Sequence, residues 1–317
     1  MFILLSGTCF FANLDRVQMG ERWENLLCCP FCHGSLEINK AKASCRGCGE
    51  EFKRLADGRI IFLSSSELEN LSSSFQIQQK DSQLHQLRNK YPKILDFPGR
   101  KRIIRFWGTA HFVYLRRDKE ILKTLFPEDN NLLILDLGAG ENPLHPGAIT
   151  IDADPQSTAQ IIANVHHLPF PDQSLDGVVA CGLFEHLKKP WECAKEIIRV
   201  LKPGGYVYIE VPLLQGIHYN PFDEQRFTPD GLETLFSGLE TIKKGVLSGP
   251  GSALAHLLPH WLAMVFSFNS SLLYEILFLI FSLLTFPIKY TDAFLIKHPR
   301  AERACFAVYY FGRKSLK

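Results

Sequence analysis

The chain lacks an excess of charge of one sign. Its 317 residues include 35 Lys and Arg against 33 Asp and Glu, which leaves a formal net charge of +2. Such a near-neutral balance argues against a protein that coats nucleic acid. The length is sufficient for two domains and a substantial hydrophobic core.

Uninterrupted apolar runs of membrane-spanning length are also missing. The apolar stretches at residues 261–266 and 276–286 fall short of the roughly 20 residues that cross a bilayer. The apolar start, residues 1–14, has no basic residue before it and no convincing cleavage site after it, so it does not fit a signal peptide. We assign residues 1–24 to an apolar tail, best explained by an extended gene start with Met19 as the initiator. A short tail that touches a membrane is the alternative.

The most informative motif is Leu-Leu-Ile-Leu-Asp-Leu-Gly-Ala-Gly at residues 132–140. It predicts a buried strand that leads into a turn whose backbone can approach a ligand closely, because Gly138 and Gly140 have no Cβ. Alone, a glycine turn after a strand is a weak signal. A second predicted strand, residues 148–152, ends in Asp152, whose carboxylate can bind both hydroxyls of a ribose.

The same alternation of strands and helices continues along the chain. The further strands that we expect are residues 159–163, 177–180, 206–211, 239–247 and 305–311. Asn164 directly follows the first of these. Two segments stand between them, Leu-Pro-Phe-Pro-Asp-Gln-Ser-Leu-Asp at residues 168–176 and Arg-Val-Leu-Lys-Pro-Gly-Gly at residues 199–205.

This order of motifs, over residues 132–235, resembles the class I (Rossmann-like) S-adenosylmethionine-dependent methyltransferases. The resemblance implies an α/β fold with a doubly wound seven-stranded sheet, and S-adenosyl-L-methionine as the cofactor. It also implies the cofactor-binding residues, which are Asp136, Gly138, Ala139 and Gly140 for the methionine part, Asp152 for the ribose and Asn164 for the adenine. The family more often has Asp at the last position, but an Asn carbonyl also accepts a hydrogen bond from the adenine amino group.

The turn departs from the family pattern after Gly140. Residues 141–147 lead almost directly into the next strand, and Pro143 and Pro146 disfavour an ordinary first helix there. We therefore expect the helix that commonly begins near the cofactor to be missing or reduced to one turn.

Nine cysteines are present, and four of them form two Cys-x-x-Cys knuckles, Cys29–Cys32 and Cys45–Cys48. Two such knuckles can close a tetrahedron around Zn²⁺, and four thiolates leave no open position, so this metal should be structural. Two disulfides fit poorly with a cofactor of the reducing cytosol. Cys28 is a spare thiol, or a substitute for Cys29. Residues 27–63 resemble the small zinc-ribbon activators of methyltransferases, and a similar ribbon begins some ribosomal RNA methyltransferases.

Residues 88–123 combine positive charge with aromatic side chains at helical spacing. The basic residues are Arg100, Lys101, Arg102, Arg105, Arg116 and Arg117. They could form a surface for RNA or a phosphorylated substrate. We favour an amphipathic helix that packs over the cofactor site and exposes its arginines to solvent, because an isolated run of charged residues usually forms the solvent-exposed face of a helix.

Candidate catalytic residues follow the fourth and fifth strands. His186 lies in Phe-Glu-His-Leu, and its alternative role is to fix the loop near the cofactor. His218 and Tyr219 lie in the loop at residues 212–229, outside the carboxyl ends of the strands, where ligands bind in open α/β sheets. They are therefore candidate bases on the substrate side. Thr228 and Pro229 should begin the next helix.

Between the sixth and seventh strands lies an apolar insertion, residues 248–304, which should be helical and border the active-site face. Its helices could dip into one leaflet, making peripheral membrane contact through residues 254–288. They could instead dock on the domain or form a dimer interface. The expected location is cytoplasmic, with peripheral attachment to the inner face of a membrane.

These features divide the chain as follows: tail 1–24, zinc ribbon 25–63, polar linker 64–90, methyltransferase domain 91–247 and 305–317, and helical insertion 248–304. Our first hypothesis is an S-adenosylmethionine-dependent methyltransferase that acts on a small or lipid-linked acceptor, at oxygen. The second is an RNA methyltransferase that uses the ribbon and the basic segment. The third is a noncatalytic scaffold, supported by the altered turn and opposed by the retained Asp152.

Overall fold

The computed structural model describes most of the chain. The described residues are 23–64, 66–69, 115–127, 132–140, 142–218 and 222–316. Tyr219 and the basic residues from Arg100 to Arg105 lie outside them, so one candidate base and most of the basic segment, whether amphipathic helix or RNA surface, have no structural description.

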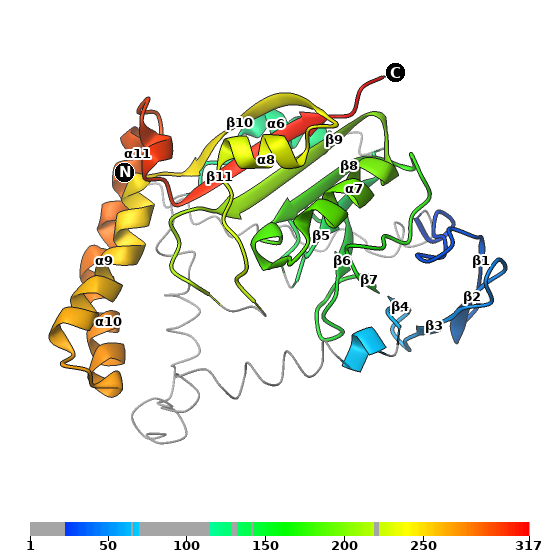
Figure 1. Cartoon of the computed structure of the whole chain (residues 1–317), viewed down its shortest axis with the longest axis horizontal. Helices are drawn as coiled ribbons and strands as arrows, with labels where there is room; N and C mark the ends of the chain where they lie inside the picture. Colours follow the sequence, from blue (N-terminus) through cyan, green and yellow to red (C-terminus); the bar gives the residue numbers. More distant parts are fainter. Residues whose placement is uncertain are drawn as a thin grey trace.

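A single mixed sheet of 11 strands runs through the described chain (Figure 1). The strands are β1 (Leu36–Ile38), β2 (Lys42–Cys45), β3 (Glu51–Arg54), β4 (Ile60–Phe62), β5 (Ile134–Leu137), β6 (Ile149–Asp152), β7 (Ile161–Ala163), β8 (Leu175–Cys181), β9 (Leu201–Pro212), β10 (Glu240–Ser248) and β11 (Ala307–Arg313). Their spatial order is β1-β2-β3-β4-β7-β6-β5-β8-β9-β11-β10. The predicted count of seven strands was therefore wrong, because the N-terminal module adds its four strands to the edge at β7.

The seven strands from β5 onwards form one continuous part of this sheet. Counted in chain order, they lie in the order 3-2-1-4-5-7-6. The strands from β7 to β9 are parallel to one another, and β11 is antiparallel to both of its neighbours, β9 and β10. The order of the strands reverses at β5, where ligands bind in doubly wound sheets.

The N-terminal module joins the sheet through a parallel pairing of β4 with β7. Ile60 pairs with Ile161, and Phe62 pairs with Ala163. The Arg59 guanidinium adds a hydrogen bond of 2.7 Å from Nη1 to the carbonyl oxygen of Ser157. This pairing covers the edge of β7, so its backbone groups are not left open to another chain.

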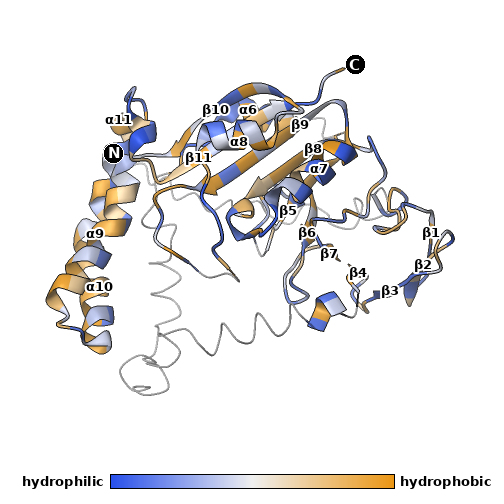
Figure 2. Ribbon diagram, viewed as in Figure 1, coloured by the Kyte–Doolittle hydropathy of each residue, from blue (hydrophilic) through white to orange (hydrophobic). Residues whose placement is uncertain are grey.

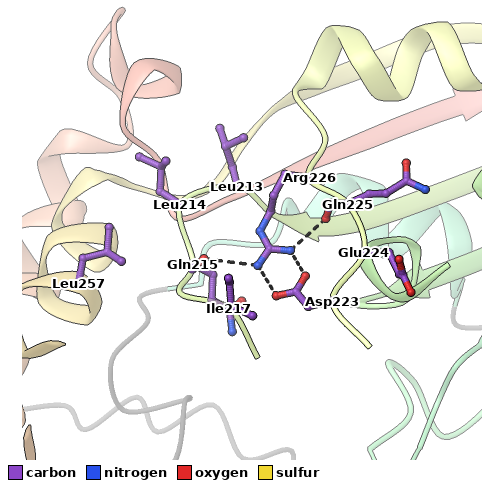
Figure 3. Close-up of a pocket in the computed structure, with 9 residues that line it drawn as sticks. All are labelled: Leu213, Leu214, Gln215, Ile217, Asp223, Glu224, Gln225, Arg226 and Leu257. Carbon is purple, nitrogen blue, oxygen red and sulfur yellow. Dashed lines mark hydrogen bonds and ion pairs between the residues drawn. The ribbon is translucent and has the colours of Figure 1, made fainter. Parts of the chain in front are cut away.

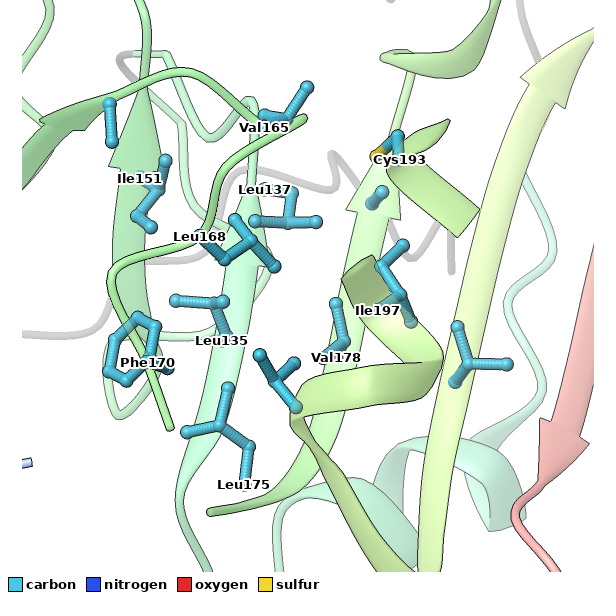
Figure 4. Close-up of a cluster of buried hydrophobic side chains, with 14 of the residues drawn as sticks. Leu135, Leu137, Ile151, Val165, Leu168, Phe170, Leu175, Val178, Cys193 and Ile197 are labelled. Atoms are coloured by element: carbon cyan, nitrogen blue, oxygen red, sulfur yellow. The ribbon is translucent and has the colours of Figure 1, made fainter. Parts of the chain in front are cut away.

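Alternate side chains of the strands fill the two faces of the sheet, as their period of two requires. On one face, Leu135 and Val178 pack with residues from α7 (Pro190–Val200) and α8 (Pro229–Leu235) (Figure 4). On the other, Ile134 and Val179 pack with residues from α6 (Lys119–Leu125) and from the start of α9 (Pro250–Phe266). The side chains of the N-terminal module continue the first of these cores.

The insertion between β10 and β11 is a helical hairpin that extends away from the sheet (Figure 1). Its elements are α9 (Pro250–Phe266), α10 (Ser271–Thr285), η3 (Phe286–Thr291), α11 (Asp292–Leu295) and η4 (Ala301–Arg303). Residues 271–295 form one continuous helical run of 25 residues, which by length and composition could cross a membrane. This run is longer than the short apolar stretch that the sequence showed, because η3 and α11 continue the turn of α10.

Asp292 fixes the base of this hairpin. Its fully buried carboxylate accepts hydrogen bonds from the backbone N–H groups of Gly249, Gly251 and Ser252, at 3.1, 2.7 and 2.8 Å. These donors belong to the first turn of α9, where a carboxylate also interacts favourably with the helix dipole. A Cβ on Gly249 would lie 2.4 Å from an oxygen of Asp292, so this close approach requires glycine. The end of the apolar run is thereby tied to the sheet.

Arg117, just before α6, lies in an ion pair that crosses the sheet face. Its Nε and Nη2 donate to the two carboxylate oxygens of Glu210 on β9, at 2.7 and 2.9 Å. Tyr208 donates from its hydroxyl to the same carboxylate at 2.8 Å. Burial opposes the charge of Arg117, but the Glu210 carboxylate outweighs it and raises the pKa of the guanidinium. The expectation of solvated arginines was therefore wrong for Arg117, whereas Arg116 is exposed.

Replacement of Arg117 by Met should destabilise the protein by about 2–3 kcal/mol, because Glu210 would remain buried without its cation. The loss should be below that of a fully buried pair, since the Arg117 side chain is 35% exposed. The measurement is urea unfolding. The double variant Arg117→Met/Glu210→Gln should recover part of the loss, and Arg116→Met should be nearly neutral. Equal destabilisation by the single and double variants would contradict this account of the pair.

Candidate functional site

The glycine turn after β5 is hydrogen-bonded to the neighbouring strand β6. Gly138 and Gly140 have φ angles of 69° and 53°, in the left-handed region that favours glycine. The backbone N–H groups of Gly138 and Ala139 donate to the carbonyl oxygen of Ile151, at 2.8 and 3.2 Å. Gly140 donates its N–H to Asp152 Oδ2 at 2.9 Å. The predicted turn residues and Asp152 are thus brought together at one edge of the sheet.

Asp136 and Asp152 place two carboxylates at this edge, at the ends of adjacent strands. Asp136 is buried and accepts a 2.7 Å hydrogen bond from the N–H of Leu144, while burial raises its pKa to about 7. Burial also raises the pKa of Asp152, whose Oδ1 accepts from the N–H of Asp154 at 2.8 Å. A buried carboxyl with a raised pKa is ready to bind a cationic group, which would stabilise its charged form.

Described residues 142–148 contain no helix, so the turn is short, as its prolines indicated. The N–H of Leu144 in this segment supplies the donor to Asp136. The ring of His145 stacks on Phe126 with centroids 4.2 Å apart, which holds the segment against the end of α6.

Asn164 follows β7, and both ends of its side chain have protein partners. Its Nδ2 donates to Glu67 Oε1 at 2.7 Å, and its Oδ1 accepts from the N–H of His166 at 3.0 Å. His166 Nδ1 lies 2.8 Å from the same oxygen. The oxygen that was predicted to face the adenine amino group is therefore engaged with His166, and the adenine contact stays a prediction.

The four knuckle cysteines form one group with the dimensions of a zinc site. Their Sγ atoms all lie within 4.8 Å of one another. The Cys29–Cys48 and Cys32–Cys45 pairs are 3.7 and 3.4 Å apart, too far for disulfides. A tetrahedral ion with Zn–S bonds of about 2.3 Å separates its sulfurs by about 3.8 Å, so these residues fit Zn²⁺. A hydrogen bond from the N–H of Cys48 lowers the pKa of Cys45 to about 6, whereas burial raises the pKa of Cys29. A bound Zn²⁺ would itself stabilise the thiolate forms.

Cys28 lies next to this group but is not part of it. Its side chain is buried, and burial raises the pKa of its thiol to about 11. Its backbone N–H donates to the carbonyl oxygen of Pro169 at 3.0 Å, so it joins the N-terminal module to the segment before β8.

His186 and His218 come together with a third residue, Glu185, which the sequence analysis did not select. His186 belongs to η2 (Phe184–His186), and its ring meets that of His218 edge-on with centroids 5.1 Å apart. Glu185 Oε1 lies 3.8 Å from His186 Nε2 and 3.9 Å from His218 Nε2. The side chain of Glu185 is only 3% exposed, and burial raises its pKa to about 7. Its position directly before His186, in Phe-Glu-His, could have identified Glu185 as a candidate site residue from the sequence.

A pocket of about 380 Å³ lies between the loop after β9 and α9 (Figure 3). Two of its lining residues, Asp223 and Glu224, contact His218 and the backbone of Glu185, respectively. Its lining residues are Leu213, Leu214, Gln215, Ile217, Asp223, Glu224, Gln225, Arg226 and Leu257. Within it, Arg226 forms an ion pair with Asp223 that fixes the loop (Figure 3). Apolar and charged side chains therefore line the same pocket.

Comparison with known proteins agrees with this architecture. Residues 144–209 match the family model described as a methyltransferase domain. An uncharacterized methyltransferase of Mycobacterium leprae (strain Br4923) is 34% identical over 62 residues, which are 20% of this chain and 23% of the relative. One of Mycobacterium tuberculosis (strain ATCC 25177 / H37Ra) is 39% identical over 49 residues, 16% of this chain and 19% of the relative. The chain thus spans about a quarter or less of the length of these relatives.

Solved structures are more distant. A SAM-dependent methyltransferase from Archaeoglobus fulgidus is 14% identical, with a TM-score of 0.36, over 62% of this chain and 90% of its own. Phosphoethanolamine N-methyltransferase 2 of Haemonchus contortus, in complex with S-adenosyl-L-methionine, is 14% identical, with a TM-score of 0.40, over 70% of this chain and 59% of its own. These likenesses carry no substrate to this chain. The described residues form a mixed α/β fold with a large central sheet, and residues 144–209 of it match a methyltransferase domain.

If the four-cysteine group binds structural zinc, as predicted, replacement of Cys48 by Ser should remove the metal and destabilise the N-terminal module, because such a site contributes its binding free energy to folding. Elemental analysis should find about one zinc per chain in the unchanged protein and far less in the variant. The matched control is Cys28→Ser, which alters a neighbouring thiol outside the group and should keep its zinc. Retention of zinc by Cys48→Ser, or its loss from Cys28→Ser, would show that the assigned ligand set is wrong.

Proposed function

We propose that this protein is an S-adenosylmethionine-dependent methyltransferase that methylates oxygen on a small or lipid-linked acceptor. The observation that carries the proposal is the glycine turn with Asp136 and Asp152, which lies where the strand order reverses in the sheet. Residues 144–209, which follow this turn, match a methyltransferase domain. A structural Zn²⁺ in the four-cysteine group is part of the proposal.

In this proposal the two carboxylates divide the binding of the cofactor. Asp136 pairs with the ammonium group of the methionine part, and Asp152 accepts hydrogen bonds from the ribose hydroxyls. The Asp152 carboxylate already accepts hydrogen bonds from the N–H groups of Gly140 and Asp154. Because a carboxylate has about four lone-pair positions, it can still accept two hydrogen bonds from the ribose hydroxyls. When bound, the cofactor supplies an activated methyl group for in-line transfer.

The remaining task is to place the acceptor and remove its proton. Alignment of two reactants can supply most of the rate enhancement in such a substitution. The pocket beside Glu185, His186 and His218 is the proposed acceptor site, and this cluster is where the hydroxyl proton is lost. Tyr219, which follows His218 in the chain, stays a candidate base by its position in the same loop.

The helical hairpin supports an acceptor that is presented at a membrane. Large apolar side chains are exposed along both helices and at the tip between them. Hydrophobic residues recur along the length of the hairpin (Figure 2). Phe268 at the tip is 84% exposed. Leu257 of α9 lines the pocket, which connects the hairpin to the acceptor site. Because Asp292 ties the end of the run to the start of α9, we propose that the hairpin dips into one leaflet rather than crossing the bilayer.

The hairpin has the dimensions for such contact. The 17 residues of α9 reach about 25 Å at 1.5 Å per residue. Exposed apolar patches of this extent mark interaction sites for membranes or proteins. Peripheral attachment would hold the pocket at the surface of a bilayer, close to a lipid-linked substrate.

Calorimetric titration of the zinc-loaded protein with S-adenosylhomocysteine tests the cofactor site. We expect saturable binding that weakens roughly 10- to 100-fold in Asp152→Asn, because a hydrogen bond to a charged group contributes about 1.5–3 kcal/mol. Asp172→Asn is the matched control, since this carboxylate is exposed and precedes β8 at the opposite edge of the sheet. A folded protein that does not bind the ligand would refute the proposed activity and favour the scaffold.

Flotation with vesicles that contain anionic lipid tests the membrane contact. The protein should float with the vesicles, and Phe268→Asp should abolish this, because a charge at the tip opposes burial in hydrocarbon. Phe294→Asp makes the same change at the base of the hairpin, where the side chain is 81% exposed. This control should leave flotation unchanged. Equal loss in both variants, or no flotation of the unchanged protein, would exclude a tip-first contact.

A further inference from the structure

We propose that Glu185, His186 and His218 bind a divalent metal ion at the acceptor side of the pocket. This site is separate from the four-cysteine group, and its catalytic role rests on the proposed methyl transfer. The ion would bind the acceptor through oxygen. The proposal therefore specifies the acceptor's chemical class, a molecule with a metal-binding hydroxyl, in addition to its size.

The three side chains already have the spacing of a ligand set. One ligand atom from each lies within 4.8 Å of the others. Glu185 Oε1 is 3.8 Å from His186 Nε2 and 3.9 Å from His218 Nε2. An ion with bonds of about 2.1 Å separates adjacent ligand atoms by about 3.0–3.4 Å. Movements of several tenths of an ångström would therefore close the set around a cation.

Glu185 supplies an observation that is independent of this spacing. Its side chain is 97% buried, and Oε2 has no hydrogen-bond partner among the described residues. A buried carboxylate oxygen without a partner is costly, and the common ways to satisfy it are pairing or metal coordination. Arg226, the nearby cation, is committed to Asp223. A metal ion between the imidazoles would satisfy the Glu185 carboxylate.

The outer contacts of both histidines leave Nε2 available. His186 Nδ1 hydrogen-bonds the carbonyl oxygen of Phe222, which makes Nδ1 the donor and places the lone pair on Nε2. His218 Nδ1 lies 3.3 Å from Asp223 Oδ2, close but not aligned for a hydrogen bond. A small rotation of the ring would complete the carboxylate–histidine–metal arrangement that is common in metal sites.

Two histidines and one carboxylate leave coordination positions open for substrate. A hydroxyl bound to the cation has a lowered pKa and loses its proton to water near neutral pH. The resulting alkoxide oxygen attacks the methyl carbon, so a C–O bond forms as the C–S bond breaks. The sulfur keeps the electron pair and becomes a neutral thioether. An acceptor with a second oxygen beside the reacting hydroxyl, such as a vicinal diol, would fill two open positions.

The test uses protein whose four-cysteine group is filled with zinc, dialysed against Co²⁺. Elemental analysis should find one cobalt per chain beside an unchanged zinc content, without the sulfur-to-cobalt absorption that thiolate ligands give. Glu185→Gln and His218→Gln should each weaken cobalt binding by at least about 100-fold, because each removes a direct ligand. His298→Gln removes an exposed imidazole elsewhere in the insertion and should bind cobalt as the unchanged protein does.

Titration with S-adenosylhomocysteine is run on the same samples. Retained binding in Glu185→Gln and His218→Gln would show that both variants are folded and that the cofactor site is independent of the metal. Loss of that binding in all proteins would refute the proposed activity and leave the cobalt result standing. Absence of cobalt from the folded unchanged protein, or equal cobalt in His218→Gln, would overturn the metal site.

Discussion

The hydrogen bonds between the glycine turn and β6 are the constraint on which the candidate site depends. The N–H groups of Gly138 and Ala139 both donate hydrogen bonds to the carbonyl oxygen of Ile151, so the chain must turn sharply as it leaves β5. This turn brings Asp136 and Asp152, 16 positions apart in sequence, to one edge of the sheet. The parallel pairing of β5 with β8 then places the segment with Glu185 and His186 beside them. A side chain on Gly138 would meet Leu183, so the same constraint sets the packing between the glycine turn and the segment that carries Glu185 and His186.

Local patterns were sufficient to predict the strands, the short turn after β5 and the grouping of the four knuckle cysteines. The strand before the glycine turn is apolar except for Asp136, as expected of a strand that is buried on both faces, and β5 lies there with all four residues buried. The prolines after Gly140 predicted the short turn, since proline removes a backbone donor and restricts the residue before it. The Cys-x-x-Cys spacing predicted the four-cysteine group, because each knuckle brings its two thiols close together. In each of these cases, the sequence pattern that allows the prediction spans only a few consecutive residues.

Contacts between distant segments were not predictable in this way. The pairing of β4 with β7 joins residues about 100 positions apart. The sequence of a strand of three residues does not indicate which other strand it will pair with. The seven-stranded prediction failed for this reason. Arg117 was assigned to solvent because the chain around it is basic, yet Glu210 lies 93 positions away and neutralises it. Asp292 likewise reads as a polar residue after an apolar run, and its role as the cap of α9 depends on the return of the chain.

Glu185 shows why a site can be missed even when its residues are adjacent in sequence. Beside His186, it reads as a polar residue in a loop, and loops usually face water. In the structure the carbonyl oxygen of Glu185 accepts from the N–H groups of Glu224 and Gln225, at 2.7 and 3.1 Å, so the loop after β9 closes over its side chain. That closure removes water from the carboxylate and brings in His218 at the same time. The proposed capacity of the cluster to bind a metal ion therefore arises because a second loop buries it. A divalent cation would be bound there by two imidazoles and a carboxylate oxygen that has no other partner and is shielded from water.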